Sequence, residues 1–92
     1  MLQRYYTHWE LHNMIYAVVK NAGSKGVTRA EICQRIGRSK TKHITDAIEE
    51  VAGRDMIVRV DLRRGSQAYY IYYAPAAAVQ AAIERGEYVD KP

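Results

Sequence analysis

Two threonine–glutamate pairs constrain the fold of this chain more than any other feature. Thr7 precedes Glu10 by three positions, and Thr28 stands in the same relation to Glu31. In such a capping box the threonine hydroxyl accepts a backbone N–H of the first helical turn, and the glutamate accepts the N–H of the threonine. Each pair stands at the head of an apolar repeat with helical spacing. The chain is therefore expected to begin with two helices whose first residues are fixed locally.

Three helices are predicted from the apolar spacing. The repeats extend over residues 7–21, 28–36 and 41–52. The second helix is so short that it needs packing to be stable. A glycine follows each repeat and is expected to end the helix: Gly23, Gly37 and Gly53.

The period then changes from helical to alternating. Residues 56–62 and 68–73 are rich in β-branched and aromatic side chains, which predicts two strands. The segment 63–67 between them is predicted to be a glycine-bearing hairpin loop. Pro75 fits the first turn of a last helix over about 76–85. The pattern predicts an α+β fold.

The composition is that of one folded domain. The chain has 92 residues, of which 48% are hydrophobic and 26% charged. We expect a domain over residues 1–86 and a flexible tail over residues 87–92. Cys33 is the single cysteine, and the N-terminal sequence lacks the apolar core of a signal peptide. We therefore expect a cytoplasmic protein, nucleoid-associated if its source is prokaryotic or viral, that is neither secreted nor bound to a membrane.

The order helix, short helix, turn, helix, hairpin, helix resembles the winged helix-turn-helix superfamily from Thr7 to about Tyr73. The resemblance is most specific at residues 28–37, at Ile44, Ile48 and Val51, and at residues 56–59. It implies a three-helix core, a C-terminal β-hairpin called the wing, and here an additional C-terminal helix. Two features depart from the common pattern. Arg38 replaces an aliphatic residue, and the gap from Gly37 to Ile44 is one residue longer.

Positive charge gathers where this resemblance places the DNA. The formal net charge is +4, and the span from Lys20 to Thr45 contains seven basic residues against the one acid Glu31. Duplex DNA is bound chiefly by displacing its counterions with lysine and arginine. In a helix-turn-helix protein this span approaches the major groove and its flanking phosphates. The location of the charge favours a nucleic-acid partner.

The resemblance therefore implies three groups of DNA-binding residues. The turn and the recognition helix contribute Arg38, Ser39, Lys40, Thr41, Lys42, His43, Thr45 and Asp46. The second helix and its approach contribute phosphate contacts from Lys25, Arg29 and Arg35. The wing contributes Arg59, Arg63 and Arg64. Asp46 has two interpretations: it accepts from a cytosine amine, or it orients Lys42. A solvated helix face and an ordinary polar hairpin tip are the alternatives for these charges.

Tyrosine is the unusual residue of the chain, with eight copies and no phenylalanine. Alternation along the second strand places Tyr69, Ile71 and Tyr73 on one face and Tyr70 and Tyr72 on the other. One face must line the core. The other is open to a dimer contact, a cover by the last helix or base stacking, of which core plus interface is favoured over stacking. We also expect a homodimer through the first and last helices, with apolar surface from Tyr5, Tyr6 and Trp9.

The remaining special residues predict no chemistry. Cys33 is expected to be a small buried side chain. His8 and His12 have metal-compatible spacing, but no carboxylate or cysteine ligand motif stands near them in the sequence, so no metal is expected. The chain carries no glycine-rich phosphate loop and no nucleophile motif. We expect no enzyme activity and no cofactor, and no small-molecule effector can be inferred.

Together these features predict sequence-specific binding of double-stranded DNA by a small transcriptional regulator. Two other classes stay open. A winged helix can serve as a protein-interaction module, although an apolar or acidic third helix would be expected there. The tyrosine-rich strand can instead bind RNA or single strands by stacking.

Overall fold

Both threonine–glutamate pairs form the helix starts that the sequence predicts. The computed structural model describes residues 7–87. In it, Thr7 caps α1 (His8–Ala22) and Thr28 caps α2 (Arg29–Ile36), with both hydrogen bonds of each capping box present. A short 3-10 helix, η1 (Gly23–Lys25), joins the two helices. The prediction of these starts was confirmed because each depends only on neighbouring residues.

The third helix, α3 (Lys42–Gly53), begins as expected and ends later than expected. Thr41 caps it by accepting the N–H of Ile44. The helix ends at Gly53, one residue after the predicted Ala52, and the left-handed residue that follows is Asp55, at φ 60°. Met56 N–H then donates to the Val51 carbonyl, as in a Schellman motif. Aspartate tolerates this conformation better than most side chains.

The hairpin is tighter than the sequence predicted. Strands β1 (Val58–Arg64) and β2 (Gln67–Tyr73) pair antiparallel, and Arg64 lies opposite Gln67. A two-residue turn therefore replaces the predicted loop over 63–67, which is wrong. Gly65 has φ 62° at the first turn position, where a type II′ hairpin turn favours glycine. The first strand also starts later than predicted, because Met56 is used to end α3.

A third segment pairs with this hairpin through one residue, Val27. Its N–H donates to the Tyr72 carbonyl at 3.1 Å, and Tyr72 N–H donates back at 2.8 Å. The preceding Gly26 is buried at φ 71°, and a Cβ there would lie 2.3 Å from Ile71 Cγ2. Only glycine fits this approach. The pairing was not predicted from the sequence, because a single residue has no periodicity.

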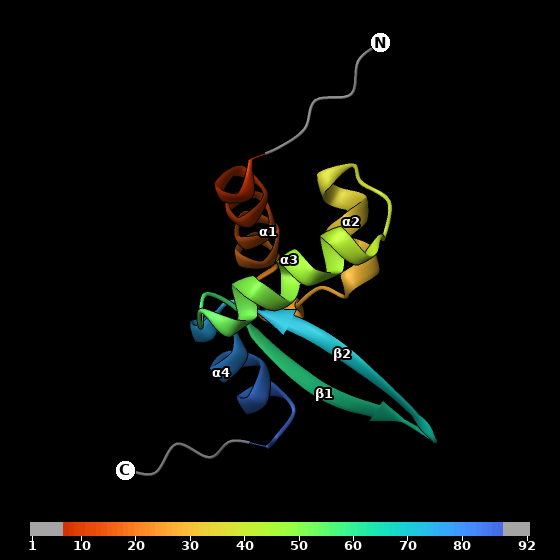
Figure 1. Cartoon of the computed structure of the whole chain (residues 1–92). Coiled ribbons are helices and arrows are strands. Elements are labelled where there is room, and N and C mark those ends of the chain that lie inside the picture. The colour runs from red at the N-terminus through yellow and green to blue at the C-terminus, as the bar shows by residue number, and fades with distance from the viewer. Residues whose placement is uncertain (1–6, 88–92) are drawn as a thin grey trace.

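The apolar faces of the helices meet as predicted. The core contains Leu11, Ile15, Val19, Val27, Ile32, Cys33, Ile36, Ile44, Ala47, Ile48, Val51, Ile57 and Tyr72. Helix α4 (Pro75–Glu84) starts with its proline in the first turn and packs against η1 and β2. Figure 1 shows α1, α2 and α3 grouped together, with the hairpin and α4 extending from the other side of α3. The α+β class is confirmed: residues 7–87 form four α-helices and a two-stranded antiparallel hairpin.

Some sequence expectations fall outside the described part of the chain. Tyr5, Tyr6 and residues 88–92 of the predicted tail lie there. Glu87, where the tail was expected to begin, still donates its N–H to the Ala82 carbonyl and so completes the end of α4 around Gly86. Among residues 7–87, no helix is both long and apolar enough to cross a membrane.

Candidate nucleic-acid interface

The start of α3 is an open, largely basic surface. Ser39, Lys40, Lys42 and His43 are all exposed. Lys42 Nζ lies 2.8 Å from Asp46 Oδ2, one helical turn along. The contact by which Asp46 would orient Lys42 is thus present, and acceptance from a cytosine amine stays a prediction. This pairing raises the pKa of Lys42, through the Asp46 hydrogen bond first and its charge second, so the lysine stays cationic.

The two threonines of this surface bond to the helix backbone. Thr41 Oγ1 accepts the N–H of Ile44, and Thr45 Oγ1 donates to the Lys42 carbonyl at 3.1 Å. Thr41 is exposed and Thr45 is half-buried. Their hydroxyls therefore stabilise the first turn of α3, while the charged and polar side chains beside them face solvent.

The basic residues before α3 divide into two kinds. Lys25 and Arg35 are exposed, and Arg38 is half-buried. Arg29 differs, since its side chain is only 27% exposed. Its Nε donates to the Tyr72 hydroxyl at 2.7 Å, and its Nη2 donates to Glu49 Oε1. The structure thus turns Arg29 toward the body of the protein.

Arg29 belongs to a network that joins four elements of the fold. The Tyr72 hydroxyl donates to Glu49 Oε1 at 2.7 Å, and Arg59 Nη1 lies 3.5 Å from Glu49 Oε2. Burial first, and the hydrogen bond to Glu49 second, raise the pKa of Tyr72 to about 12, although the bond from Arg29 acts to lower it. Burial also acts to raise the pKa of Glu49, but hydrogen bonds from Tyr72 and Arg29 outweigh it, and the pKa is lowered. The carboxylate is therefore held charged between two arginines.

The sequence did not reveal this network. Glu49 was not among the predicted site residues, and Tyr72 was expected only to occupy one strand face. Their pairing depends on how β2 packs beside α3, and no local pattern encodes that. The one available signal was charge. A small domain that contains Glu49, Arg29 and Arg59 offers this glutamate two possible ion-pair partners.

The hairpin arginines occupy two environments. Arg63 and Arg64 are exposed next to the turn, and the Arg64 guanidinium lies 6.0 Å from the centre of the Tyr69 ring. Arg59 lies at the base of the hairpin, where it contacts Glu49, Asp61 and the ring of Tyr70. The tip therefore presents positive charge to solvent, whereas the base has its charge largely compensated.

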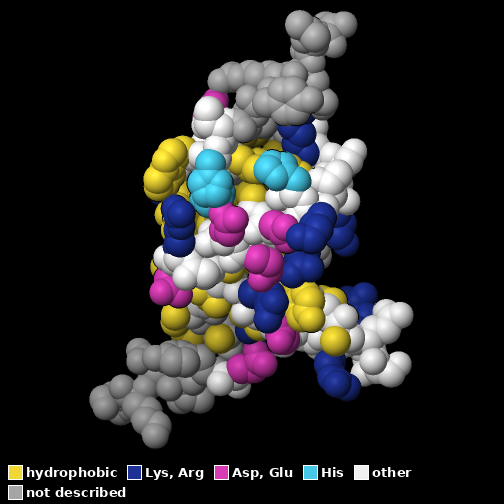
Figure 2. All heavy atoms as spheres, in the orientation of Figure 1, with side chains coloured by type: hydrophobic (Ala, Val, Ile, Leu, Met, Phe, Trp, Pro, Cys, Tyr) yellow, Lys and Arg dark blue, Asp and Glu magenta, His cyan; other side chains and the backbone are white. Residues whose placement is uncertain are grey.

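These basic groups occur on one side of the molecule. In Figure 1 the α2–α3 connection and the hairpin tip project toward the same side. Figure 2, in the same orientation, shows lysine and arginine side chains gathered along that side, over the connection and again on the hairpin. Acidic side chains lie across the middle of the view, over α3. The basic side chains of the connection and of the hairpin thus border a common surface.

Burial of the strand tyrosines follows their position along β2. Tyr72 and Tyr73, at the base, are both buried, although Tyr72 faces Glu49 and Tyr73 accepts a hydrogen bond from Arg85 beyond α4. Tyr69 is half-buried and Tyr70 is 39% exposed. The predicted alternation is present, but both faces are covered at the base, where α1, α2 and α4 all contact β2.

One further cluster combines residues that could hold a metal ion. His8 and His12 of α1 meet Glu50 of α3. Glu10 stands between these histidines in the sequence but caps Thr7, so the carboxylate of the cluster comes from another helix. Burial lowers the pKa of His12, as does the charge of His8, while Glu50 acts in the opposite direction. By contrast, Cys33 is buried, and burial raises the pKa of its thiol, as expected of an unreactive core cysteine.

This chain belongs to DUF7646, a family of domains of unknown function, which matches residues 7–77. The match begins at the residue that caps α1 and extends through β2 into the first turn of α4. It therefore includes every element of the network around Glu49 and of the histidine–glutamate cluster. No curated protein matches the chain in sequence.

Proposed function

We propose that this chain is a winged helix-turn-helix protein that binds double-stranded DNA sequence-specifically, as a small transcriptional regulator. The observation that carries the proposal is that basic side chains near the front of α3 and on the hairpin lie on the same side of the molecule (Figure 2). Two separate chain segments thus supply positive charge to that side. If the charge on α3 were only that of a solvated helix face, basic side chains from a second segment would not be expected on the same side.

In this proposal α3 enters the major groove with its N-terminal half. The first turn of α3 carries no acidic side chain, and the N-terminus of a helix favours nearby phosphates. Lys40 and Lys42 would contact phosphates or guanine, and Ser39 and His43 would face base edges. Arg35 and Lys25, exposed on neighbouring elements, would bind the flanking backbone.

Arg63 and Arg64 would contact the backbone or the minor groove beside the hairpin tip. Arg29 and Arg59 receive a different role from the one predicted from sequence. Because both pair with Glu49, we assign them to positioning α3 against the sheet. The proposal includes no catalysis and no cofactor, and it places the protein in the cytoplasm.

We also propose that the protein acts as a homodimer through α1 and α4. Val79 and Ile83 of α4 are 47% and 42% exposed, and Trp9 of α1 is 64% exposed. A single module buries too little DNA surface for high specificity. Analytical ultracentrifugation should therefore give a dimer at DNA-binding concentrations. A monomer bound to DNA at those concentrations would contradict this part.

The decisive experiment is selection from random DNA duplexes, followed by anisotropy titrations with the selected sequence. Unlabelled duplex DNA should compete, whereas single-stranded DNA and duplex RNA should compete poorly. Selection of no common sequence, with no binding even at low salt, would overturn the proposal in favour of a protein-interaction module. Competition by single strands instead would favour a stacking role for the hairpin tyrosines.

The double variant Arg63→Ala/Arg64→Ala tests the hairpin within this experiment. For each arginine that binds a phosphate, its removal should lower the slope of log affinity against log salt by about one. Arg54→Ala is the matched control, because Arg54 follows the opposite end of α3 and its guanidinium lies over Trp9. Equal slopes for the double variant and the wild type would remove the hairpin from the interface.

A further inference from the structure

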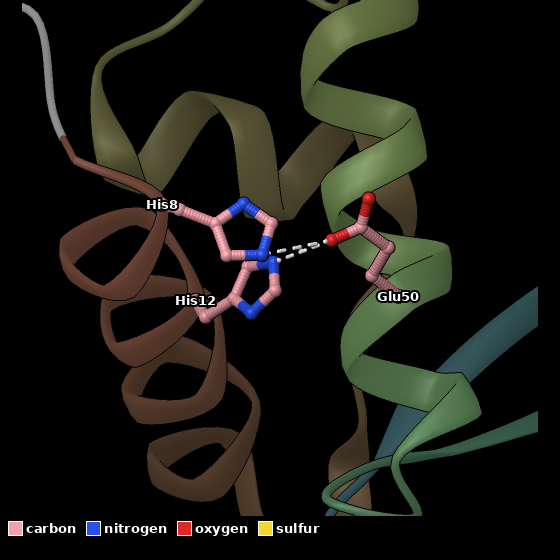
Figure 3. Close-up of side chains that lie close together, drawn as sticks. All are labelled: His8, His12 and Glu50. Atoms are coloured by element: carbon pink, nitrogen blue, oxygen red, sulfur yellow. Dashed lines mark ion pairs between the residues drawn. The ribbon is translucent and has the colours of Figure 1, made fainter.

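Two imidazoles and one carboxylate converge between α1 and α3, away from the front of α3. His8 Nε2 lies 3.2 Å from Glu50 Oε2, and His12 Nε2 lies 3.1 Å from the same oxygen. The two imidazole rings are 4.1 Å apart, centre to centre. Figure 3 shows both rings extending from α1 toward Glu50. The histidines are one turn apart on α1, so they share one face of that helix.

His12 is the unusual member of this cluster. It is 1% exposed, and neither of its ring nitrogens makes a hydrogen bond within the described residues. Buried polar atoms are almost always paired, and an unpaired one requires an explanation. The Nε2 atom is close enough to Glu50 for a hydrogen bond, but its N–H direction does not fit one. The close contact with this oxygen therefore leaves the buried ring without a hydrogen bond.

We propose that His8, His12 and Glu50 bind a divalent transition-metal ion of the zinc class through Nε2, Nε2 and one carboxylate oxygen. Two imidazoles and a carboxylate are a common three-residue ligand set for tetrahedral zinc with an open fourth position. Metal–ligand bonds of about 2.0–2.2 Å at tetrahedral angles place ligand atoms about 3.3 Å apart. The two observed N–O separations are close to that value.

The same geometry accounts for the misaligned contact of His12. In a tetrahedral site each nitrogen points at the ion, so neighbouring ligand atoms approach one another without a hydrogen bond between them. An ordinary ion pair has to satisfy two imidazoles with one carboxylate oxygen, and it leaves His12 unpaired. The ligand atoms already lie within 4.8 Å of one another, so only small rotations are needed to close around an ion.

Such an ion would cross-link α1 to α3 at a point where the rest of the packing is apolar. Binding to the folded state alone raises the melting temperature with metal concentration. This inference does not depend on DNA binding, because the cluster would stabilise the fold whatever its surface binds. It also differs from the sequence expectation that the protein contains no metal.

The test uses the full chain without a histidine tag, freed of metal by a chelator. Calorimetric titration with zinc chloride should give one ion per chain, and cobalt(II) should produce the intense visible bands of tetrahedral coordination. Zinc should also raise the melting temperature. Glu50→Gln and His8→Gln should each weaken zinc binding by about 100-fold or more, since even outer-shell changes cost 10–100-fold.

Both residues are at least half exposed in their side chains, so these variants should fold; circular dichroism checks this. His43→Gln is the matched control, because it removes an exposed histidine elsewhere on α3. It should bind zinc like the wild type. No zinc binding by the wild type, or equal affinity in Glu50→Gln and His8→Gln, would overturn the site. Weak octahedral cobalt bands would overturn the proposed geometry.

Discussion

The two halves of α3 differ in their polar contacts, although one apolar stripe runs through both. The first half presents Lys42, His43 and Asp46 to solvent. The second half contains Glu49 and Glu50, and each contacts other elements of the fold. Glu49 bonds to α2 and β2, and Glu50 contacts α1. The polar contacts that fix the helix are thus concentrated at the end away from its exposed basic residues.

This difference shows how a small domain can hold a surface helix firmly and keep one end of it open. Glu49 and Glu50 are neighbours in sequence, so their side chains point about 100° apart around α3 and reach different elements. Glu49 is also compensated where it lies, since Arg29 and Arg59 accompany it. A polyanion approaching the front half therefore meets little uncompensated negative charge from Glu49.

The largest expected effect comes from reversing the charge of the front half. Lys40→Glu/Lys42→Glu should lower affinity for duplex DNA about 100-fold at low salt, because two phosphate contacts become repulsive. Its melting temperature should stay near that of the wild type, since both side chains are exposed. Anisotropy titration and thermal melting measure the two quantities. A comparable loss of affinity in Arg54→Glu, at the other end of α3, would show that only total charge matters.

A smaller effect is expected from the rear half, where a substitution should change stability and leave DNA affinity nearly unchanged. Tyr72→Phe removes the hydroxyl that donates to Glu49 and accepts from Arg29. Urea unfolding should show a loss of about 1–3 kcal/mol, because two partly buried charged groups each lose a partner. DNA affinity of the folded fraction should change little. Tyr69→Phe is the control on the same strand, and an equal loss there would mean that the network contributes nothing special.

The rear half should also make stability depend on pH. The pKa of Glu49 is lowered in the folded state from its usual 4.5, so the unfolded chain binds more protons as the medium becomes acidic. The stabilisation is therefore present above the usual pKa and is lost as pH falls through the folded pKa. Compared with Glu49→Gln, the wild type should be more stable at neutral pH, and the gap should close in acid. A gap that widens in acid in urea titrations would contradict the assignment.

The smallest expected effect concerns the end of the rear half. Asp55 adopts φ 60° after α3, a conformation that glycine reaches without strain. Asp55→Gly should therefore stabilise the protein by up to about 1 kcal/mol, seen as a higher denaturant midpoint. Gly53→Ala makes the matched comparison, because Gly53 lies within the helix, where alanine is also favoured. Destabilisation by Asp55→Gly would show that the aspartate side chain has a role of its own.

How far the sequence predicts this molecule depends on how local each feature is. The capped starts at Thr7 and Thr28 and the left-handed glycine at Gly37 depend on a few adjacent residues, and all were predicted correctly. The end of α3 was predicted to within one residue, but the left-handed conformation of Asp55 after it was not predicted.

The candidate sites also divide into local features, which were predicted, and contacts between distant segments, which were not. Exposure of the α2–α3 turn and of the hairpin tip followed from residue types and their order. The partners of Glu49 and Glu50 did not, since each lies on an element distant in sequence. His8 and His12 show this clearly: their spacing was visible, but the third residue of the cluster is brought to them only by the packing of α3 on α1.

The backbone pairing of Val27 with Tyr72 has a consequence for how this protein is made and dissected. Tyr72 is among the last core residues to be synthesised, and it completes the bonding of the segment that precedes α2. In a nascent or truncated chain that stops before β2, the N–H and the carbonyl of Val27 lack their partners in Tyr72. Arg29 and Glu49 then also lack their hydrogen bonds to the Tyr72 hydroxyl. The three helices are therefore not expected to fold as a separate peptide, because the hairpin supplies hydrogen-bond partners that they need.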